Sequence, residues 1–169
     1  MRVIGIAALG TEPPKNLVEK ASVFVRKLSK TCGKTVIAVG GYWGLMKHVV
    51  DLALSEGIKV LIFPPVEKED YYFPEEAIVV RTGLGYRLRS VALVKTSNIL
   101  VALGGEAGTI QEIVTAYTEG KPILVLDETG LSTDKLKTLA PYIDARKTAK
   151  VEYIRDPETL ALRACEFLR

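Results

Sequence analysis

The residues best suited to chemistry lie in one stretch, LGGEAGTIQE, which runs from Leu103 to Glu112. An apolar strand end leads into a glycine pair, a Gly-Thr step and then a glutamate. Glycine lets the backbone turn sharply and lets a ligand come close, and the helix that follows offers free N–H groups to an anion. A carboxylate at this place can serve as an acid or a base. The stretch is typical of an anion-binding turn that carries a catalytic glutamate.

The same stretch has a purely structural interpretation. Thr109 and Glu112 stand as T-I-Q-E ahead of an apolar helix, which is the spacing of a capping box. In that motif the threonine side chain accepts a backbone N–H of the first turn and the glutamate reaches back to the cap residue. Spacing alone favours this interpretation. The two are compatible, because a capping box would preform the helix end and fix Glu112 at once.

Three predicted strand-to-helix junctions are rich in glycine, and together they favour a phosphate-bearing ligand. Tight turns need glycine even without a ligand, so a single junction would be weak evidence. None of the three ends in the Lys-Ser/Thr of a P-loop, and none has the full G-x-G-x-x-G spacing. The candidate binding residues at these junctions are Gly10 and Thr11, then Gly40, Gly41 and Gly44, then Gly104, Gly105, Gly108 and Thr109.

Arginine and aromatic side chains near these junctions are further candidates. Arg87 and Arg89 stand two residues apart, so they cannot share one helix face, and one of them is expected to point toward the strand ends. There it would bind an anion or hold a carboxylate, whereas a solvated surface arginine is the commoner case. Tyr42 and Trp43 are suited equally to stacking on a planar ligand and to a core or dimer contact.

Apolar runs of strand length alternate with segments of helical period, which predicts an α/β fold. We expect a single Rossmann-like, doubly wound domain over residues 1–169, with a mainly parallel sheet and helices on both faces. Ligands of such sheets bind outside the carboxyl ends of the strands, where the strand order reverses. The loop at 64–76 and a last helix capped by Asp156, with Pro157 at its first position, complete the pattern. The predicted strands are Val3–Leu9, Thr35–Val39, Ile58–Phe63, Ile78–Val80, Asn98–Leu103, Pro122–Leu126 and Val151–Ile154, and the predicted helices centre on 17–28, 45–53, 84–92 and 110–117.

Composition excludes several classes of protein. The net charge is only +3, without a dense basic block, so we expect no nucleic-acid partner. No apolar run reaches the ~18 residues of a membrane span, and we expect a cytoplasmic protein that needs no membrane. Cys32 and Cys165 are then expected to be reduced thiols. A single histidine, His48, leaves too few ligands for zinc, so no metal site is predicted. Asp127 and Glu128, in the segment DETG, are read as a turn.

The pair of motifs GGYWGLM at 40–46 and GGEAGTIQE at 104–112 resembles the Lonely Guy family of nucleoside 5'-monophosphate phosphoribohydrolases, once described as lysine decarboxylases. The resemblance extends to about Leu126. It implies a Rossmann-like fold, a nucleotide phosphate at the Gly-Thr turn, catalytic roles for Arg89 and Glu112, and a homodimer or larger assembly. The positions that match the first family motif are Gly41, Gly44, Leu45 and Met46, and those that match the second are Gly108, Thr109 and Glu112.

Three departures from the family pattern point to a sister group, which is similar to the molybdenum-cofactor carrier proteins of algae. Glu106 stands where the family has glycine, Ser90 replaces the lysine after the arginine, and Lys47 replaces the glycine after GLM. A carboxylate beside a phosphate is repulsive. Two functions therefore stay open: hydrolysis of an N-glycosidic bond, or binding and carrying of a pterin-type cofactor or nucleotide without chemistry. The ligand itself is left unassigned.

Overall fold

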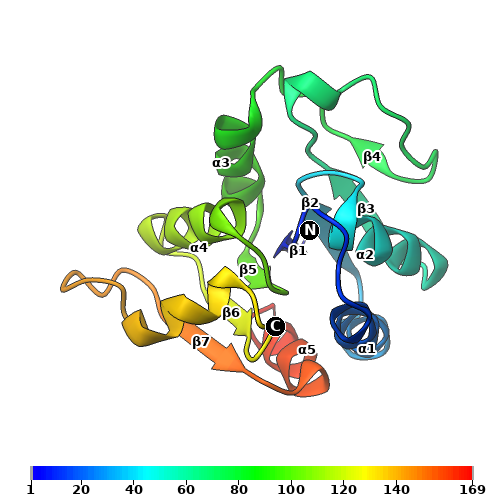
Figure 1. The fold of residues 1–169 in the computed structure, drawn as a ribbon. Coiled ribbons are helices and arrows are strands. Elements are labelled where there is room, and N and C mark those ends of the chain that lie inside the picture. The colour runs from blue at the N-terminus through cyan, green and yellow to red at the C-terminus, as the bar shows by residue number, and fades with distance from the viewer. Residues whose placement is uncertain (1, 169) are drawn as a thin grey trace.

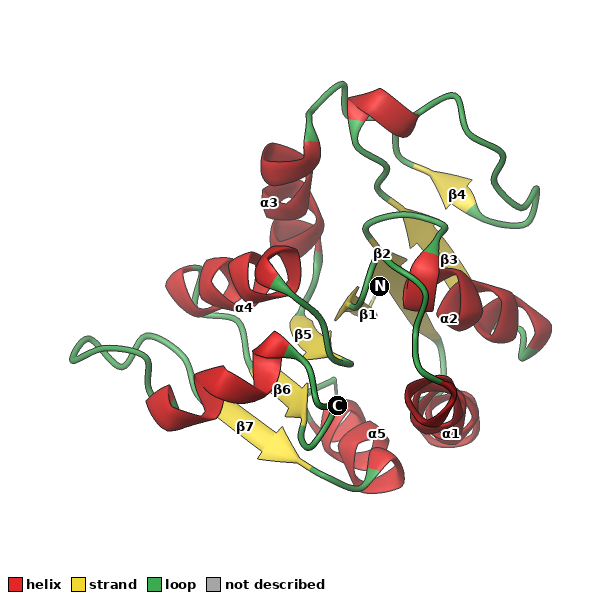
Figure 2. Cartoon of the chain, in the orientation of Figure 1, coloured by secondary structure: helices red, strands yellow, loops and turns green. Residues whose placement is uncertain are grey.

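The computed structural model describes residues 2–168 of the chain, and strands alternate with helices along them (Figures 1 and 2). The elements in this part of the chain are β1 (Arg2–Ala7), α1 (Lys15–Thr31), β2 (Thr35–Val39), α2 (Gly44–Ser55), β3 (Lys59–Ile62), the 3-10 turn η1 (Val66–Lys68), β4 (Ile78–Val79), α3 (Tyr86–Thr96), β5 (Ile99–Ala102), α4 (Ala107–Thr118), β6 (Ile123–Leu126), the 3-10 segment η2 (Ser132–Leu139), β7 (Val151–Ile154) and α5 (Pro157–Glu166).

The strands form one parallel sheet in the order β4-β3-β2-β1-β5-β6-β7. The central strand β1 pairs with β2 on one side and with β5 on the other. The chain therefore builds outward from β1 in one direction, crosses back, and builds outward in the other. This reversal is the switch point that the doubly wound pattern predicts, and it brings the loops after β1, β2 and β5 to one place.

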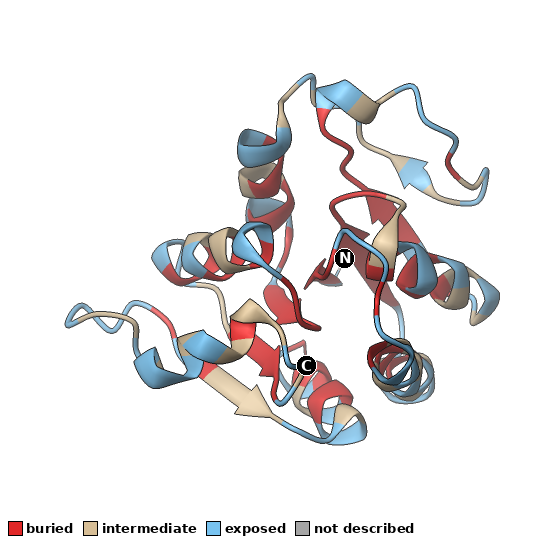
Figure 3. Ribbon diagram, viewed as in Figure 1, coloured by how far each residue is buried: buried red, intermediate tan, exposed pale blue. Residues whose placement is uncertain are grey.

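Helices cover both faces of the sheet, so the predicted fold class is confirmed. Figure 1 shows α1, α2 and α5 on one face and α3 with α4 on the other. Side chains of β1 alternate between the two resulting cores: Ile4 and Ile6 pack with the first group of helices, and Val3 and Ala7 pack with the second. The strands β1, β2, β3, β5 and β6 are buried almost throughout (Figure 3), which explains why they form near-continuous apolar runs in the sequence.

The last helix begins as its sequence predicts. The Asp156 side chain accepts a hydrogen bond from the backbone N–H of Thr159 at 2.7 Å, and Pro157 opens α5. The predicted loop at 64–76 contains the short turn η1, and the edge strand β4 follows it. No helix within residues 2–168 is long and apolar enough to cross a membrane.

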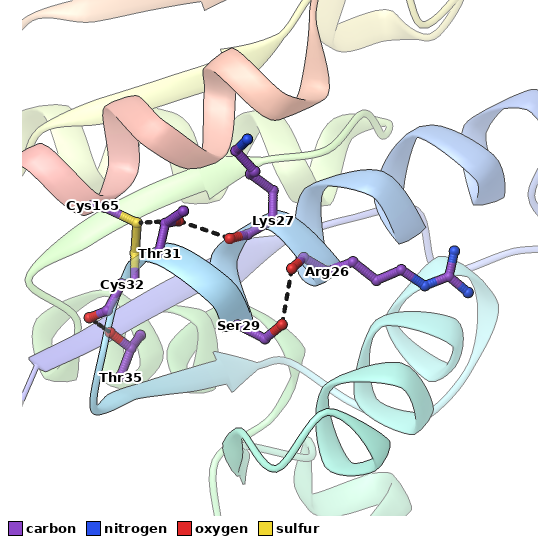
Figure 4. The surroundings of a disulfide bond; sticks show 7 residues. All are labelled: Arg26, Lys27, Ser29, Thr31, Cys32, Thr35 and Cys165. Atoms are coloured by element: carbon purple, nitrogen blue, oxygen red, sulfur yellow. Dashed lines mark hydrogen bonds between the residues drawn. A yellow bond between two sulfur atoms is a disulfide. The ribbon is translucent and has the colours of Figure 1, made fainter.

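The two cysteines form a disulfide, so the expectation of reduced thiols is wrong (Figure 4). Cys32 caps the end of α1 and Cys165 lies in α5, and these helices pack side by side. Their Cα atoms are 5.0 Å apart, within the range that a disulfide spans. The two residues are separated by 133 positions in the sequence. Only the packing of the two helices brings them together.

Candidate functional site

The three glycine-rich loops meet at the switch point and are joined by backbone hydrogen bonds. The N–H of Leu9, after β1, donates to the carbonyl of Gly104, after β5, at 2.9 Å. The N–H of Leu45, at the start of α2, donates to the carbonyl of Leu9, also at 2.9 Å. These bonds tie the loops into one unit, and α2 and α4 start from that unit. The carboxyl ends of the central strands are thereby covered by a preformed turn system.

A cavity of about 220 Å³ lies beside this unit. Its wall includes seven of the residues predicted to be catalytic or ligand-binding: Gly10, Thr11, Met46, Arg89, Gly108, Thr109 and Glu112. The other lining residues are Ala8, Leu9, Trp43, Tyr86, Arg87, Ser90, Glu106 and Gln111. The structure therefore brings the arginine, the glutamate and the Gly-Thr turn to one cavity. It places Gly40, Gly41, Gly44, Leu45, Gly104 and Gly105 outside the lining.

Arg89 and Glu112 form a buried ion pair across two helices. Arg89, on α3, is only 6% exposed, and Glu112, on α4, is 7% exposed. Arg89 Nη1 lies 3.2 Å from Glu112 Oε1, and the Ser90 hydroxyl lies 3.0 Å from the same oxygen. In contrast, Arg87 is exposed. The expectation that the two arginines diverge is therefore confirmed, and Arg89 is the one directed into the protein.

Burial shapes the protonation of this pair. Burial raises the pKa of Glu112, although Arg89 and Ser90 pull it in the other direction. Burial also lowers the pKa of Arg89, against the attraction of Glu112. Arg89 Nε is buried and finds no hydrogen-bond partner in the described part of the chain. A buried donor without a partner costs about 1–3 kcal/mol of stability, so the pair leaves one polar atom that an added acceptor would satisfy.

The capping box predicted at Thr109 and Glu112 is wrong. Helix α4 begins at Ala107, and its N-cap is Glu106, whose side chain makes no capping hydrogen bond. Thr109 therefore lies inside the first turn, and Glu112 lies one turn further on. Glu112 does not reach back to the cap because its carboxylate is held by Arg89 and Ser90 on α3. The contact with Arg89 and Ser90 on α3 therefore determines the position of the Glu112 carboxylate, and the capping box does not form.

The glycines outside the lining make room for other parts of the protein. A Cβ added to Gly40 would collide with Arg89 Nη1, and one added to Gly105 would collide with the Thr109 hydroxyl. Gly44 has φ of +54°, and its added Cβ would lie 2.6 Å from the carbonyl carbon of Gly10. Gly40 and Gly105 thus leave room for the arginine and the threonine, and Gly44 leaves room for the backbone of the loop after β1. A direct role at a phosphate is not needed to explain them.

Gly108 differs from those glycines. It lines the cavity as the second residue of α4, its φ is not positive, and an added Cβ would meet no atom within 4 Å. No contact within residues 2–168 therefore requires a glycine at this position. Space beside the N–H groups of a helix start is where an anion binds.

Aromatic residues form the rim of the cavity. Trp43 lines it and caps the start of α2, whereas Tyr42 is outside the lining and hydrogen-bonds Asp51. Tyr86 was not singled out from the sequence, although it stands one helical turn before Arg89, and the guanidinium lies 6.0 Å from its ring centre. Its spacing of three residues from Arg89 on a helix is a signal that could have revealed it.

The remaining sequence candidates lie elsewhere or have structural partners. Asp127 is buried at the end of β6, where it pairs with Lys137 and accepts a hydrogen bond from the N–H of Glu128. It does not line the cavity. His48 is exposed on α2. Across residues 2–168 there is no group of three or more His, Cys, Asp or Glu side chains that could hold a metal ion.

Comparison with known proteins places the chain by family and by fold. The model of the SLOG cluster4 family matches residues 1–161. An uncharacterized protein of Archaeoglobus fulgidus is 35% identical over 91 residues, which are 54% of this chain and 59% of that protein. The chain thus matches little more than half of the length of this relative.

Solved structures agree over nearly the whole chain. A protein called TM1055 superposes with a TM-score of 0.85 at 26% identity, covering 98% of this chain and 99% of that one. The molybdenum cofactor carrier protein of Chlamydomonas reinhardtii gives 0.80 at 21% identity, with coverages of 99% and 98%. The molybdenum cofactor binding protein of Rippkaea orientalis gives 0.78 at 21% identity, with 98% and 95%. The resemblance read from the two glycine motifs is confirmed.

Proposed function

Starting from the premise that the chain belongs to the SLOG cluster4 family, we propose that it binds a small ligand through a phosphate group held between Arg89 and the start of α4. The observation that carries the proposal is the buried Nε of Arg89, which has no partner within residues 2–168. Buried donors are nearly always satisfied. A phosphate oxygen accepts from a guanidinium, and others accept from the free N–H groups of the first turn of α4.

Glu112 fits this proposal through its raised pKa. A carboxylate beside a phosphate is repulsive while both are charged. Because burial favours the neutral form of Glu112, proton uptake relieves the repulsion when an anion arrives. The released guanidinium of Arg89 then turns its charge toward the ligand. Ligand binding, together with proton uptake by Glu112, therefore makes the positive charge of Arg89 available to the ligand.

The proposed ligand is a nucleotide or a pterin-type cofactor, bound without chemistry. Two structures with this fold belong to proteins named for binding or carrying the molybdenum cofactor, and their identity of 21% supports the fold alone. The volume of the cavity limits how much of the ligand it can enclose. Its 220 Å³ is below the roughly 300–1,000 Å³ of pockets that enclose a whole small molecule. The phosphate end enters, and the planar end lies at the aromatic rim near Trp43.

Displacing the guanidinium tests the phosphate site. In Gly40→Ala the new methyl group occupies the space of Arg89 Nη1, and Arg89→Lys keeps the charge but loses the fork. We expect both variants to weaken the binding of AMP and of a pterin monophosphate about tenfold or more, measured by titration calorimetry. Arg81→Lys, an exposed arginine in the loop before α3, is the control. Unchanged affinity in both folded variants refutes the proposal.

A second function, hydrolysis of the N-glycosidic bond of a nucleoside 5'-monophosphate, is favoured by Glu112. Its carboxyl lines the cavity, and both hydrogen bonds that it accepts within residues 2–168 end on Oε1. Oε2 is thus the atom suited to activate water or to stabilise an oxocarbenium-like ribose. Incubation with AMP, followed by chromatography for free adenine, tests this function. Release that persists in Glu112→Gln excludes Glu112 as the catalytic group, and no release from any monophosphate leaves the carrier function.

The resemblance also implies a homodimer or larger assembly, and this stays a prediction. Sedimentation of the purified protein at several concentrations measures it directly. A sedimenting mass equal to the 18.5 kDa of one chain at all concentrations would exclude a stable assembly.

A further inference from the structure

Lys68, in the turn η1, holds its ammonium over aromatic rings at the rim of the cavity. Its Nζ lies 4.2 Å from the ring centre of Trp43, 5.3 Å from that of Tyr71 and 6.0 Å from that of Tyr86. Figure 2 shows η1 as a short helical turn in the long connection between β3 and β4. A cation within about 6 Å of a ring face is attracted by the ring quadrupole. The rings thus hold the charge in one place.

Lys68 is half-buried and has no ionic partner. Within residues 2–168 its Nζ makes no salt bridge and no hydrogen bond, although acids flank it on both sides. Glu69 accepts a hydrogen bond from the N–H of Gly83 at 2.8 Å. Glu67 makes no hydrogen bond or salt bridge within residues 2–168, and its negative charge works against the lowering of the Arg89 pKa by burial. The turn therefore holds its lysine over the rings without an ion pair to either acid.

Lys68 adds a positive charge beside the cavity. The lining carries two cations, Arg87 and Arg89, and two acids, Glu106 and Glu112, which cancel. Trp43 and Tyr86 belong to both the lining and the ring cluster around Lys68. The ammonium consequently lies just outside the rim, and it adds a cation at the entrance. Because it makes no salt bridge within residues 2–168, it is available to attract an anionic ligand.

We propose that Lys68 is a specificity-determining residue, which selects ligands that carry a second anionic group beyond the phosphate held by Arg89. The inference rests on the proposed function, because it needs the first phosphate to occupy the cavity. With only 220 Å³ available, the rest of the ligand projects past Trp43 and Tyr86. The ammonium stands where that projecting part leaves the cavity, and the rings that hold it spare the ordering cost of a free lysine chain.

A comparison of one-phosphate and two-phosphate probes tests the role of Lys68. AMP is the first probe, and adenosine 3',5'-bisphosphate and ADP are the second, each titrated calorimetrically at two salt concentrations. We expect at least one two-phosphate probe to bind the native chain more tightly than AMP. Lys68→Gln should reduce that preference about fivefold or more while leaving the affinity for AMP nearly unchanged. Lys68→Arg should retain the preference, and the preference should shrink as salt increases.

Lys47 supplies the matched control. Its Nζ also lies over a ring, at 4.8 Å from the centre of Tyr42, but it is paired with Asp51 at 2.6 Å. Lys47→Gln should therefore leave the preference intact. If Lys68→Gln keeps the native preference while Arg89→Lys weakens every probe, the role of Lys68 is refuted and the phosphate site stands. If Arg89→Lys changes no probe, the proposed function fails, and the inference about Lys68 fails with it.

Discussion

Gly108→Ala should make the protein more stable and its ligand binding weaker. The glycine is the second residue of α4, it has no positive φ, and an added Cβ would meet no atom within 4 Å. The folded chain thus tolerates alanine without strain. Replacing such a glycine removes freedom from the unfolded chain, which raises the free energy of unfolding by about 0.4–1 kcal/mol. For a domain of this size the melting temperature should rise by about 1–4 °C.

Binding should change in the opposite direction. The open space beside Gly108 lines the cavity at the helix start, where the phosphate is proposed to lie against backbone N–H groups. A methyl group there keeps the phosphate from at least one of these groups. A hydrogen bond to a charged group contributes about 1.5–3 kcal/mol, so the affinity for AMP should decrease about tenfold or more.

Two measurements on each variant decide the outcome. Denaturant unfolding gives the stability, and calorimetric titration with AMP gives the affinity. Ala107→Gly is the control, because it alters the preceding residue of the same helical turn without touching the cavity lining. It should lower the stability by a similar amount and leave the affinity unchanged. Native affinity in Gly108→Ala would mean that no ligand approaches the start of α4, and a loss of stability would mean that a side chain at position 108 collides with other atoms.

Three further predictions concern stability. Asp156→Ala should lower the free energy of unfolding by about 0.5–2 kcal/mol, because the α5 cap is lost. The hydrogen bonds from Thr159 lower the pKa of Asp156, so the contribution of the cap is complete above the ordinary pKa of 3.8 and is lost as the pH falls through the lower pKa of the folded state. Urea unfolding between about pH 2 and 5 can follow this loss. Reducing the disulfide between Cys32 and Cys165 should lower the free energy of unfolding by about 2–5 kcal/mol, since it closes a loop of 133 residues; equal melting of oxidised and reduced protein would contradict this. Because burial raises the pKa of Glu112 above its ordinary 4.5, the native chain should lose stability as the pH rises through the folded value, and Glu112→Gln should flatten that slope.

The alternation of strand-length apolar runs with helical periods already determined the fold class. Strands buried on both faces read as continuous runs, because side chains of both parities are buried, as Ile4 and Val3 of β1 are in the two cores. The cap at Asp156 was also predictable from the sequence, because an N-cap depends only on a few neighbouring residues. The meeting of Arg89, Glu112 and the Gly-Thr turn followed from strand topology, because the carboxyl ends of neighbouring parallel strands lie at one edge.

Tertiary structure decided what depended on contacts between distant segments. Glu112 fits a local capping box by its spacing, yet α3 supplies Arg89 and Ser90, and a buried carboxylate takes the partner that offsets its loss of water. The pairing of Cys32 with Cys165 depends on how α1 packs against α5, which no local pattern records. The glycines that the sequence groups as one phosphate-binding set have different roles in the structure: Gly40 leaves room for Arg89, whereas Gly108 leaves space that no atom of residues 2–168 fills. Sequence specifies which residues can turn or ionise, and only packing specifies which neighbour each of them meets.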